Sequence, residues 1–101
     1  MPYPKTLVLK ISDPAKLDLQ DIIQYTFEHY GEAQVETYLQ ALYDGMGLLC
    51  KNPAIGHSRD DIPVGYELFG IEKHLLLFTA TDDELIIARI LHHSMDIKRH
   101  F

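Results

Sequence analysis

One glycine, Gly31, separates two long segments of helical periodicity, and this single-residue connection constrains the fold more than any other feature of the sequence. A helix can begin at Ser12-Asp13-Pro14, because Ser or Asp caps free N–H groups and proline suits the first turn. Gly31 is expected to end it as a left-handed cap, and a second helix runs from Glu32 to about Lys51, where Asn52-Pro53 stops it. Helices joined by one residue must double back, so the sequence predicts an antiparallel helix hairpin. Its expected buried positions are Ala15, Leu19, Ile22, Ile23, Thr26 and Tyr30, then Val35, Tyr38, Leu39, Leu42, Met46 and Leu49.

The other apolar segments have the pattern of β-strands. Apolar and polar side chains alternate in residues 6–11, and the later strand candidates are 66–71, 74–81 and 84–92. Short turns between these three predict an antiparallel meander, and residues 54–65 are expected to form a loop. We therefore expect an α+β fold in which the N-terminal strand and the meander form one sheet with the helices on one face. A chain of 101 residues fits a single domain spanning 1–101.

Two strands of the meander are apolar on both of their faces. Residues 75–78 and 85–88 contain no charged side chain, so both faces of the sheet need cover. The helix hairpin can cover one face. Two interpretations remain open for the other: it is a binding surface for another chain, or the loop 54–65 and the C-terminal tail cover it.

The charge balance excludes a protein whose main work is to neutralise phosphates. Fifteen Asp and Glu against nine Lys and Arg give a net charge of −6, whereas non-specific nucleic-acid binding depends on cationic contacts. We expect no direct nucleic-acid binding, although a local basic patch stays open. The single Cys50 excludes an intramolecular disulfide, and the chain starts without a signal-peptide pattern. These features predict a cytoplasmic protein without a membrane-spanning segment.

No pattern in the sequence indicates catalysis or a cofactor. None of the six histidines has a usual metal-ligand spacing, and His92 and His93, adjacent at a strand end, are expected to point to opposite faces. Cys50 lies near a helix C-terminus and is predicted to be a buried, inert thiol. We therefore predict no catalytic residue, no metal and no cofactor. Gly45 and Gly47 inside the second helix indicate either close packing or local flexibility.

In order and spacing, several phrases resemble the ParE branch of the RelE/ParE superfamily of bacterial toxins. The resemblance covers nearly the whole chain. The most specific mark is the pairing of Asn52-Pro53-Ala54-Ile55-Gly56 with Ile90-Leu91-His92-His93-Ser94-Met95-Asp96. The other marks are the phrases at 15–22, 30–34, 48–49 and 59–61.

The resemblance implies one of two toxic activities. RelE-like members cut messenger RNA on the ribosome with basic and aromatic side chains, whereas ParE-like members bind DNA gyrase and trap it on cleaved DNA. This chain has Glu67, Gly70 and Thr79 where the family often has an arginine, a proline and another arginine. Loss of cations disfavours RNA cleavage, so the resemblance implies a gyrase inhibitor that acts by protein–protein binding and is not an enzyme. Glu67 and Thr79 are expected to lie together on the sheet face where an RNA-cutting relative needs cations.

The resemblance also implies two protein partners and the residues that meet them. A ParD-like antitoxin is expected to dock on the helix hairpin and the uncovered sheet face, at Tyr25, Phe27, Tyr43, Phe69 and Phe78. DNA gyrase is expected to meet the tail, at His92, Met95, Asp96 and Arg99. Each of these aromatic residues has an alternative role in packing, and Met95 and Ile97 can instead pin the tail to the core.

Two alternatives to the gyrase hypothesis remain. The first is a ribosome-dependent endoribonuclease of the RelE type that uses Arg89, His92 and Lys73. The second is a degenerate, non-toxic module that binds an antitoxin, which the departures at Glu67, Gly70 and Thr79 would explain.

Overall fold

The computed structural model describes residues 5–95 and residue 97, and its element order matches the order expected from the sequence. Three strands are one or two residues shorter than predicted, the strand predicted at 84–92 has those bounds, and the α+β prediction is confirmed. No helix among the described residues is long and apolar enough to cross a membrane. The elements are β1 Val8–Ile11, α1 Asp13–Tyr30, α2 Glu32–Lys51, the 3-10 helix η1 Pro53–Ile55, β2 Glu67–Ile71, β3 His74–Ala80 and β4 Glu84–His92.

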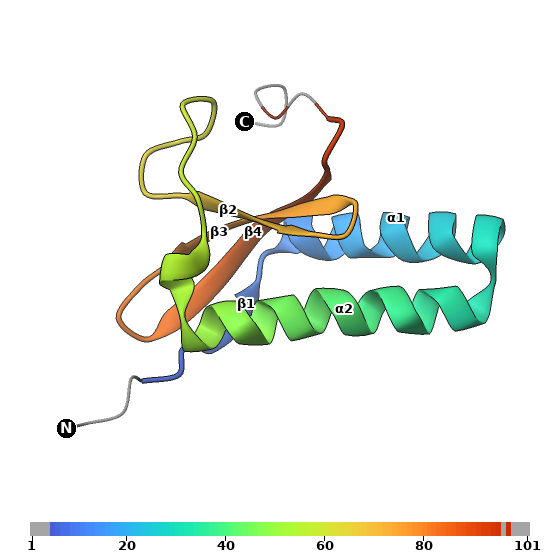
Figure 1. Cartoon of the computed structure of the whole chain (residues 1–101), viewed down its shortest axis with the longest axis horizontal. Coiled ribbons are helices and arrows are strands. Elements are labelled where there is room, and N and C mark those ends of the chain that lie inside the picture. Colours follow the sequence, from blue (N-terminus) through green and yellow to red (C-terminus); the bar gives the residue numbers. More distant parts are fainter. Residues whose placement is uncertain (1–4, 96, 98–101) are drawn as a thin grey trace.

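The four strands form one sheet in the order β1-β4-β3-β2 (Figure 1). The last three strands form the predicted antiparallel meander. β1 joins it in parallel, with Val8 opposite Glu84 and Ile11 opposite Ile87. Parallel neighbours need a long connection, and here the helix hairpin, β2 and β3 all lie between β1 and β4 in the chain. The chain therefore places its first strand beside its last one, a pairing that alternation alone does not predict.

The helix hairpin begins and turns at the residues expected from the sequence. Ser12 caps α1, because its Oγ accepts a hydrogen bond from the Ala15 N–H at 3.1 Å. Gly31 has a φ of 86°, so the requirement for glycine is confirmed. Its ψ of 176° is extended, however, so it is not the left-handed helical cap that we expected. Its N–H still donates to the Phe27 carbonyl and closes the helix.

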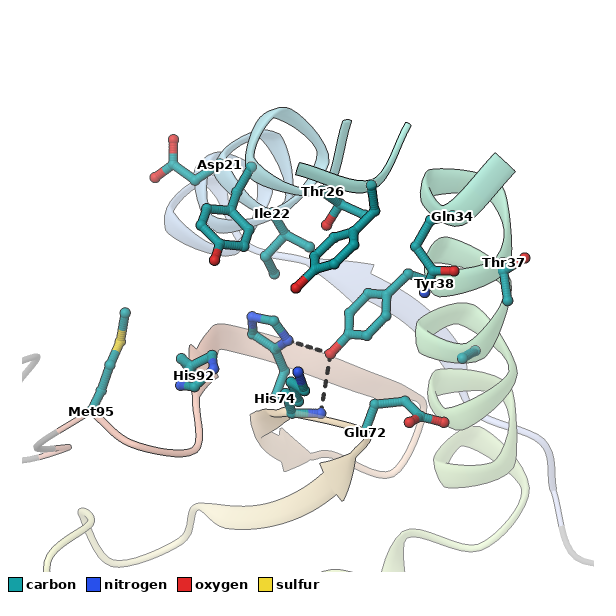
Figure 2. Close-up of a pocket in the computed structure, with 14 residues that line it drawn as sticks. Asp21, Ile22, Thr26, Gln34, Thr37, Tyr38, Glu72, His74, His92 and Met95 are labelled. Carbon is teal, nitrogen blue, oxygen red and sulfur yellow. Dashed lines mark hydrogen bonds between the residues drawn. The ribbon is translucent and has the colours of Figure 1, made fainter. Parts of the chain in front are cut away.

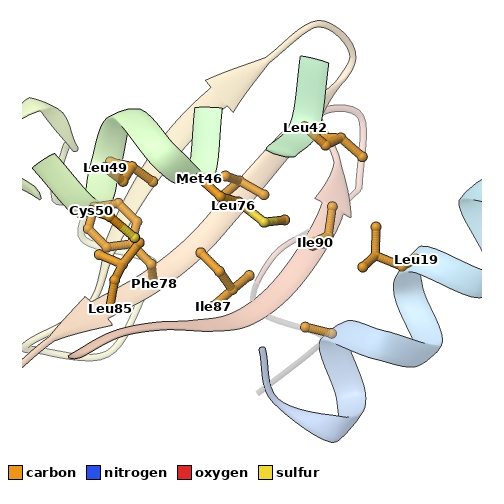
Figure 3. Close-up of a cluster of buried hydrophobic side chains, with 11 residues drawn as sticks. Leu19, Leu42, Met46, Leu49, Cys50, Leu76, Phe78, Leu85, Ile87 and Ile90 are labelled. Atoms are coloured by element: carbon orange, nitrogen blue, oxygen red, sulfur yellow. The ribbon is translucent and has the colours of Figure 1, made fainter. Parts of the chain in front are cut away.

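The main core lies between the helix hairpin and one face of the sheet (Figure 3). Apolar side chains from both helices meet those of β3 and β4, so the sheet face under the helices is closed. The buried members are Ala15, Leu19, Leu42, Met46, Leu49, Cys50, Leu76, Phe78, Leu85, Ile87 and Ile90. Burial raises the pKa of the Cys50 thiol, which fits the prediction of an inert cysteine.

The opposite face of the sheet carries a second, smaller core. Its buried members are Ile62, Leu68, Leu77, Leu91 and Ile97. Ile62 comes from the loop after η1, and Ile97 follows β4. Of the two interpretations left open, the structure therefore supports cover by the loop and the tail. The expectation of an uncovered sheet face for a partner is wrong at these positions.

β4 contains one extra residue relative to β3, and its side chains contribute to both cores. The pairing with β3 shifts between Leu77, opposite Arg89, and Phe78, opposite Ile87, so Ala88 is unpaired in the ladder. As a result Ile87 and Ile90, three residues apart, both face the helices, which simple alternation does not allow.

The tip of the helix hairpin extends beyond the end of the sheet (Figure 1). Helical periodicity places Ile23 and Tyr30 on the buried stripe, but their side chains are 36% and 63% exposed. Val35 is only half-buried, and Tyr38 and Leu39 are half-buried where they pack against the main core. The prediction that Ile23 and Tyr30 are buried is therefore wrong, because the sheet does not extend far enough to cover the tip of the hairpin.

The two glycines of α2 have different surroundings. A Cβ at Gly45 would overlap the end of the Ile71 side chain and lie 2.9 Å from its Cγ1, so close packing accounts for this glycine. A Cβ at Gly47 would have no atom within 4 Å, so packing does not explain it. Gly56 is a stronger case, because a Cβ there would lie 2.7 Å from Cε1 of the buried Phe78 ring.

Candidate protein-binding groove

A groove of about 780 Å³ lies between the protruding half of the helix hairpin and the end of the sheet (Figure 2). α1 and α2 form one wall. The turn between β2 and β3 and the end of β4 form the other. The lining residues are Asp21, Ile22, Tyr25, Thr26, Tyr30, Gln34, Thr37, Tyr38, Ala41, Glu72, Lys73, His74, His92 and Met95.

Tyr38 and His74 join the two walls at the floor of the groove. The Tyr38 hydroxyl accepts a hydrogen bond from the Lys73 N–H at 3.2 Å and lies 2.5 Å from His74 Nδ1 (Figure 2). A tyrosine hydroxyl has one proton and two lone pairs, so after accepting from Lys73 it can either donate to Nδ1 or accept from it, and the His74 tautomer sets the direction. The rings meet edge to face with centroids 5.4 Å apart. This contact connects α2 to the start of β3.

Three histidines lie together beside Tyr38. The His74 and His92 ring centroids are 5.3 Å apart, and those of His92 and His93 are 4.6 Å apart. The expectation that His92 and His93 point to opposite faces is therefore wrong, because β4 ends at His92 and alternation stops there. Among the residues described by the structure, no group of three His, Cys, Asp or Glu side chains is arranged to hold a metal ion.

The surroundings of His74 keep its ring neutral. The pKa of His74 is lowered to about 4, mainly by burial and also by the nearby His92 and His93, while the Asp18 carboxylate acts in the opposite direction. Burial also raises the pKa of Tyr38. Both shifts favour the uncharged forms of the two hydrogen-bonded side chains.

We expect His74 to make folding stability depend on pH. The unfolded chain binds this proton near pH 6.5, whereas the folded chain binds it at about 4, so acidification between these values favours unfolding. After allowance for partial exposure, the free energy of unfolding should fall by about 1–2 kcal/mol from this group. Urea unfolding at pH 7 and pH 4.5 measures it. His74→Gln should lose that part of the pH dependence and the exposed His29→Gln should retain it. Identical pH profiles for all three proteins would contradict the assignment.

The structure separates the five aromatic residues predicted to meet an antitoxin. Tyr25 lines the groove and is 56% exposed, whereas Phe27 and Tyr43 are exposed on the hairpin outside it. Phe69 is half-buried against the main core. Phe78 is 1% exposed within that core, so the expectation that it contacts a partner is wrong. Its apolar strand position is equally typical of a core residue.

Two of the four residues predicted to meet gyrase lie in the same groove. His92 and Met95 line its sheet side, and Met95 is 45% exposed. Asp96 and Arg99 lie outside the described residues. The sequence did not single out Tyr38 or His74. Tyr38 and His74 are 36 residues apart, so no local pattern indicates their contact. His74 and His92 are neighbours because β3 and β4 pair at these positions.

Arg89, a residue of the endoribonuclease alternative, is engaged within the fold. Its Nε and Nη2 donate to the two Asp18 carboxylate oxygens at 2.8 and 2.9 Å. The Ile90 N–H donates to the same carboxylate at 2.9 Å. The hydrogen bond to Asp18 raises the pKa of Arg89 still further. The Arg89 guanidinium therefore connects β4 to α1 through Asp18.

The departures at Glu67 and Thr79 lie on different faces of the sheet. Glu67 shares a face with Phe69, toward the helices, and Thr79 shares a face with Leu77. The Thr79 hydroxyl donates to the Gly65 carbonyl at 2.8 Å. The expectation that both lie on one sheet face is wrong. Glu67 is paired with Phe78, and Thr79 is the next residue along that strand, so its side chain points to the opposite face.

Residues 9–97 match the family described as the ParE toxin of the type II toxin–antitoxin system parDE. The chain belongs to the ParE toxin family. The match spans both helices and all four strands except Val8, so it covers every wall of the groove. The ParE resemblance seen in the sequence is thereby confirmed.

Curated relatives agree with this assignment over nearly their whole length. Toxin ParE1 of Mycobacterium tuberculosis is 32% identical over 91 residues, which are 89% of this chain and 93% of that protein. Toxin ParE1 of Caulobacter vibrioides is 28% identical and covers 90% of this chain and 94% of its own. A solved chain titled "Chromosomal ParDE TA system from P. aeruginosa" has a TM-score of 0.74 at 20% identity and covers 87% of this chain and 97% of its own. That likeness supports the fold.

Proposed function

We propose that this ParE-family toxin inhibits DNA gyrase by protein–protein binding and that a ParD-like antitoxin neutralises it. The carrying observation is the open, partly aromatic groove between the helix hairpin and the sheet. Grooves with exposed apolar side chains and few charges are typical of sites that receive a segment of another protein. The ParDE name of the matched family supports an antitoxin as one such partner.

The same geometry provides a mechanism for neutralisation. Tyr25, predicted to meet the antitoxin, and His92 and Met95, predicted to meet gyrase, line one groove. An antitoxin segment seated there covers His92 and Met95, so the two partners compete for one surface. The proposed target implies action in the cytoplasm.

Three features support a toxin that acts without cutting RNA. The net charge is −6, which disfavours binding to phosphates. Arg89 is held by Asp18 and is not directed at a substrate. Tyr38 and His74 are hydrogen-bonded to each other, and the pKa shifts of both side chains favour their neutral forms.

A gyrase supercoiling assay with purified protein tests the proposal. We expect loss of supercoiling with accumulation of cleaved DNA, and intact messenger RNA in a translating extract that receives the same protein. His92→Ala with Met95→Ala should raise the concentration needed for inhibition at least tenfold, because both side chains face the groove. Val64→Ala, at a fully exposed position outside the groove, is the matched control.

Two results would overturn the proposal in different directions. Cleaved messenger RNA with unaffected gyrase would favour the endoribonuclease alternative. Absence of both effects, with no growth arrest after induced expression, would favour the non-toxic module that binds an antitoxin.

A further inference from the structure

We infer that the groove accepts a cationic amphipathic segment, with apolar anchors that enter the groove and Lys or Arg side chains that flank them. This inference rests on the proposed function, which assigns the segment to the antitoxin, and it specifies the chemistry that this partner must have. Its basis is the combination of a partly apolar groove with an acidic surface around it.

The protruding half of the hairpin has an unusual charge distribution. Residues 20–44 contain no Lys or Arg and five carboxylates, at Asp21, Glu28, Glu32, Glu36 and Asp44. The stretch spans the tip of the hairpin and supplies nine of the lining residues. A partner that lies along it therefore meets a negative potential over several turns of helix.

Carboxylates also stand on both walls of the groove. Asp21 comes from α1, and Glu72 comes from the turn between β2 and β3, on the opposite side of the Tyr38–His74 contact (Figure 2). Of the described lining residues, Lys73 alone has an ammonium or guanidinium group. Glu72 has a φ of 54°, a conformation that favours glycine, so a carboxylate is present here despite its backbone cost.

The aromatic side chains supply the apolar part of the recognition. Tyr25 and Tyr30 on the helix wall are 56% and 63% exposed, and Met95 on the sheet wall is 45% exposed. Each can gain buried area when an apolar anchor enters between the walls. The tyrosine ring faces also attract Lys and Arg side chains, so aromatic and acidic residues favour the same partner.

The same charges disfavour two other occupants. A second copy of this chain would bring another acidic hairpin against this one, since the whole chain has a charge of −6. Nucleic acid would bring phosphates to a groove walled by Asp21 and Glu72. A positively charged protein segment is the occupant with complementary charge.

Two designed peptides test the inference with the full-length chain. Both are 18-residue amphipathic helices with leucine at the same positions, and one has lysine and the other glutamate at every remaining position. Fluorescence anisotropy of labelled peptide measures the affinity. We expect the lysine peptide to bind at least tenfold more tightly than the glutamate peptide, and to weaken as salt increases.

Paired charge reversals locate the interaction. Asp21→Lys with Glu72→Lys should weaken binding of the lysine peptide at least tenfold. Asp60→Lys with Asp82→Lys changes the net charge equally at exposed turn positions outside the groove and should change binding less than threefold. Equal losses in both double variants, or equal affinity for both peptides, would overturn the inference. The peptides contain no gyrase, so a failed supercoiling assay with retained, groove-dependent binding would reject the toxin function and leave the groove chemistry intact.

Discussion

Phe78→Ala is expected to lower the free energy of unfolding by about 3–5 kcal/mol, enough to unfold a marginally stable domain of this size. The Phe78 ring is 1% exposed in the main core, and its edge lies where a Cβ on Gly56 would be. Removal of the ring leaves a cavity between β3 and the segment after α2, and the backbone at Gly56 has no side chain to fill it. Urea unfolding followed by far-ultraviolet circular dichroism measures the change.

Tyr25→Ala is the matched control, because the family resemblance implies that Tyr25 and Phe78 are both aromatic contacts of an antitoxin. Tyr25 is 56% exposed, so its truncation should change the free energy of unfolding by less than about 0.5 kcal/mol. A cost below about 1 kcal/mol for Phe78→Ala would contradict its place in the core.

Asp18→Ala is expected to destabilise the fold by about 2–4 kcal/mol. The Asp18 carboxylate accepts hydrogen bonds from Arg89 Nε, Arg89 Nη2 and the Ile90 N–H, all within 2.9 Å. Its side chain is 13% exposed and that of Arg89 is 26% exposed, so this pair is better shielded than the ion pairs at the surface. Without the carboxylate, a guanidinium and a backbone N–H lose their partner beside the irregular pairing of β4.

A double variant distinguishes the contribution of the ion pair from that of the packing of α1 on β4. Asp18→Ala with Arg89→Leu removes both charges, so it should recover part of the loss seen in Asp18→Ala. Chemical denaturation of Asp18→Ala, Arg89→Leu, the double variant and Asp18→Asn measures these differences. A double variant as unstable as the sum of the two single variants would show that the charges act independently, contrary to the observed bidentate geometry.

Local signals account for most of the secondary structure. Ser12, Gly31 and Asn52-Pro53 mark the helix ends with groups that the backbone needs at those points, so the sequence predicts the hairpin closely. The predictions of burial fail where the burial of a side chain depends on an element far away in the sequence. Tyr30 follows the helical stripe yet is exposed, because the sheet ends before the tip of the hairpin. Phe78 was assigned to a surface because alternation cannot show which face of a strand the helices cover.

In the candidate site, too, the sequence indicates some residues, whereas others are found only from the tertiary structure. Aromatic and tail residues were recognisable as candidates, and Tyr25, His92 and Met95 do line one groove. Tyr38 and His74 were not recognisable, because a hydrogen bond across 36 residues leaves no local pattern. The shift of pairing beside Leu77 is equally invisible to alternation, although it decides which β4 residues face the helices.

By itself, the sequence determined the antiparallel hairpin, the meander and the acidic surface, because periodicity, caps, turns and charge are properties of neighbouring residues. Only the tertiary structure decided that β1 pairs in parallel with β4, that Arg89 is held by Asp18, and that a groove opens beyond the sheet. Each of these depends on the relative lengths and positions of elements far apart in the chain. The single glycine at 31 requires the two helices to run antiparallel, and the shorter sheet beneath them leaves a groove beside their tip.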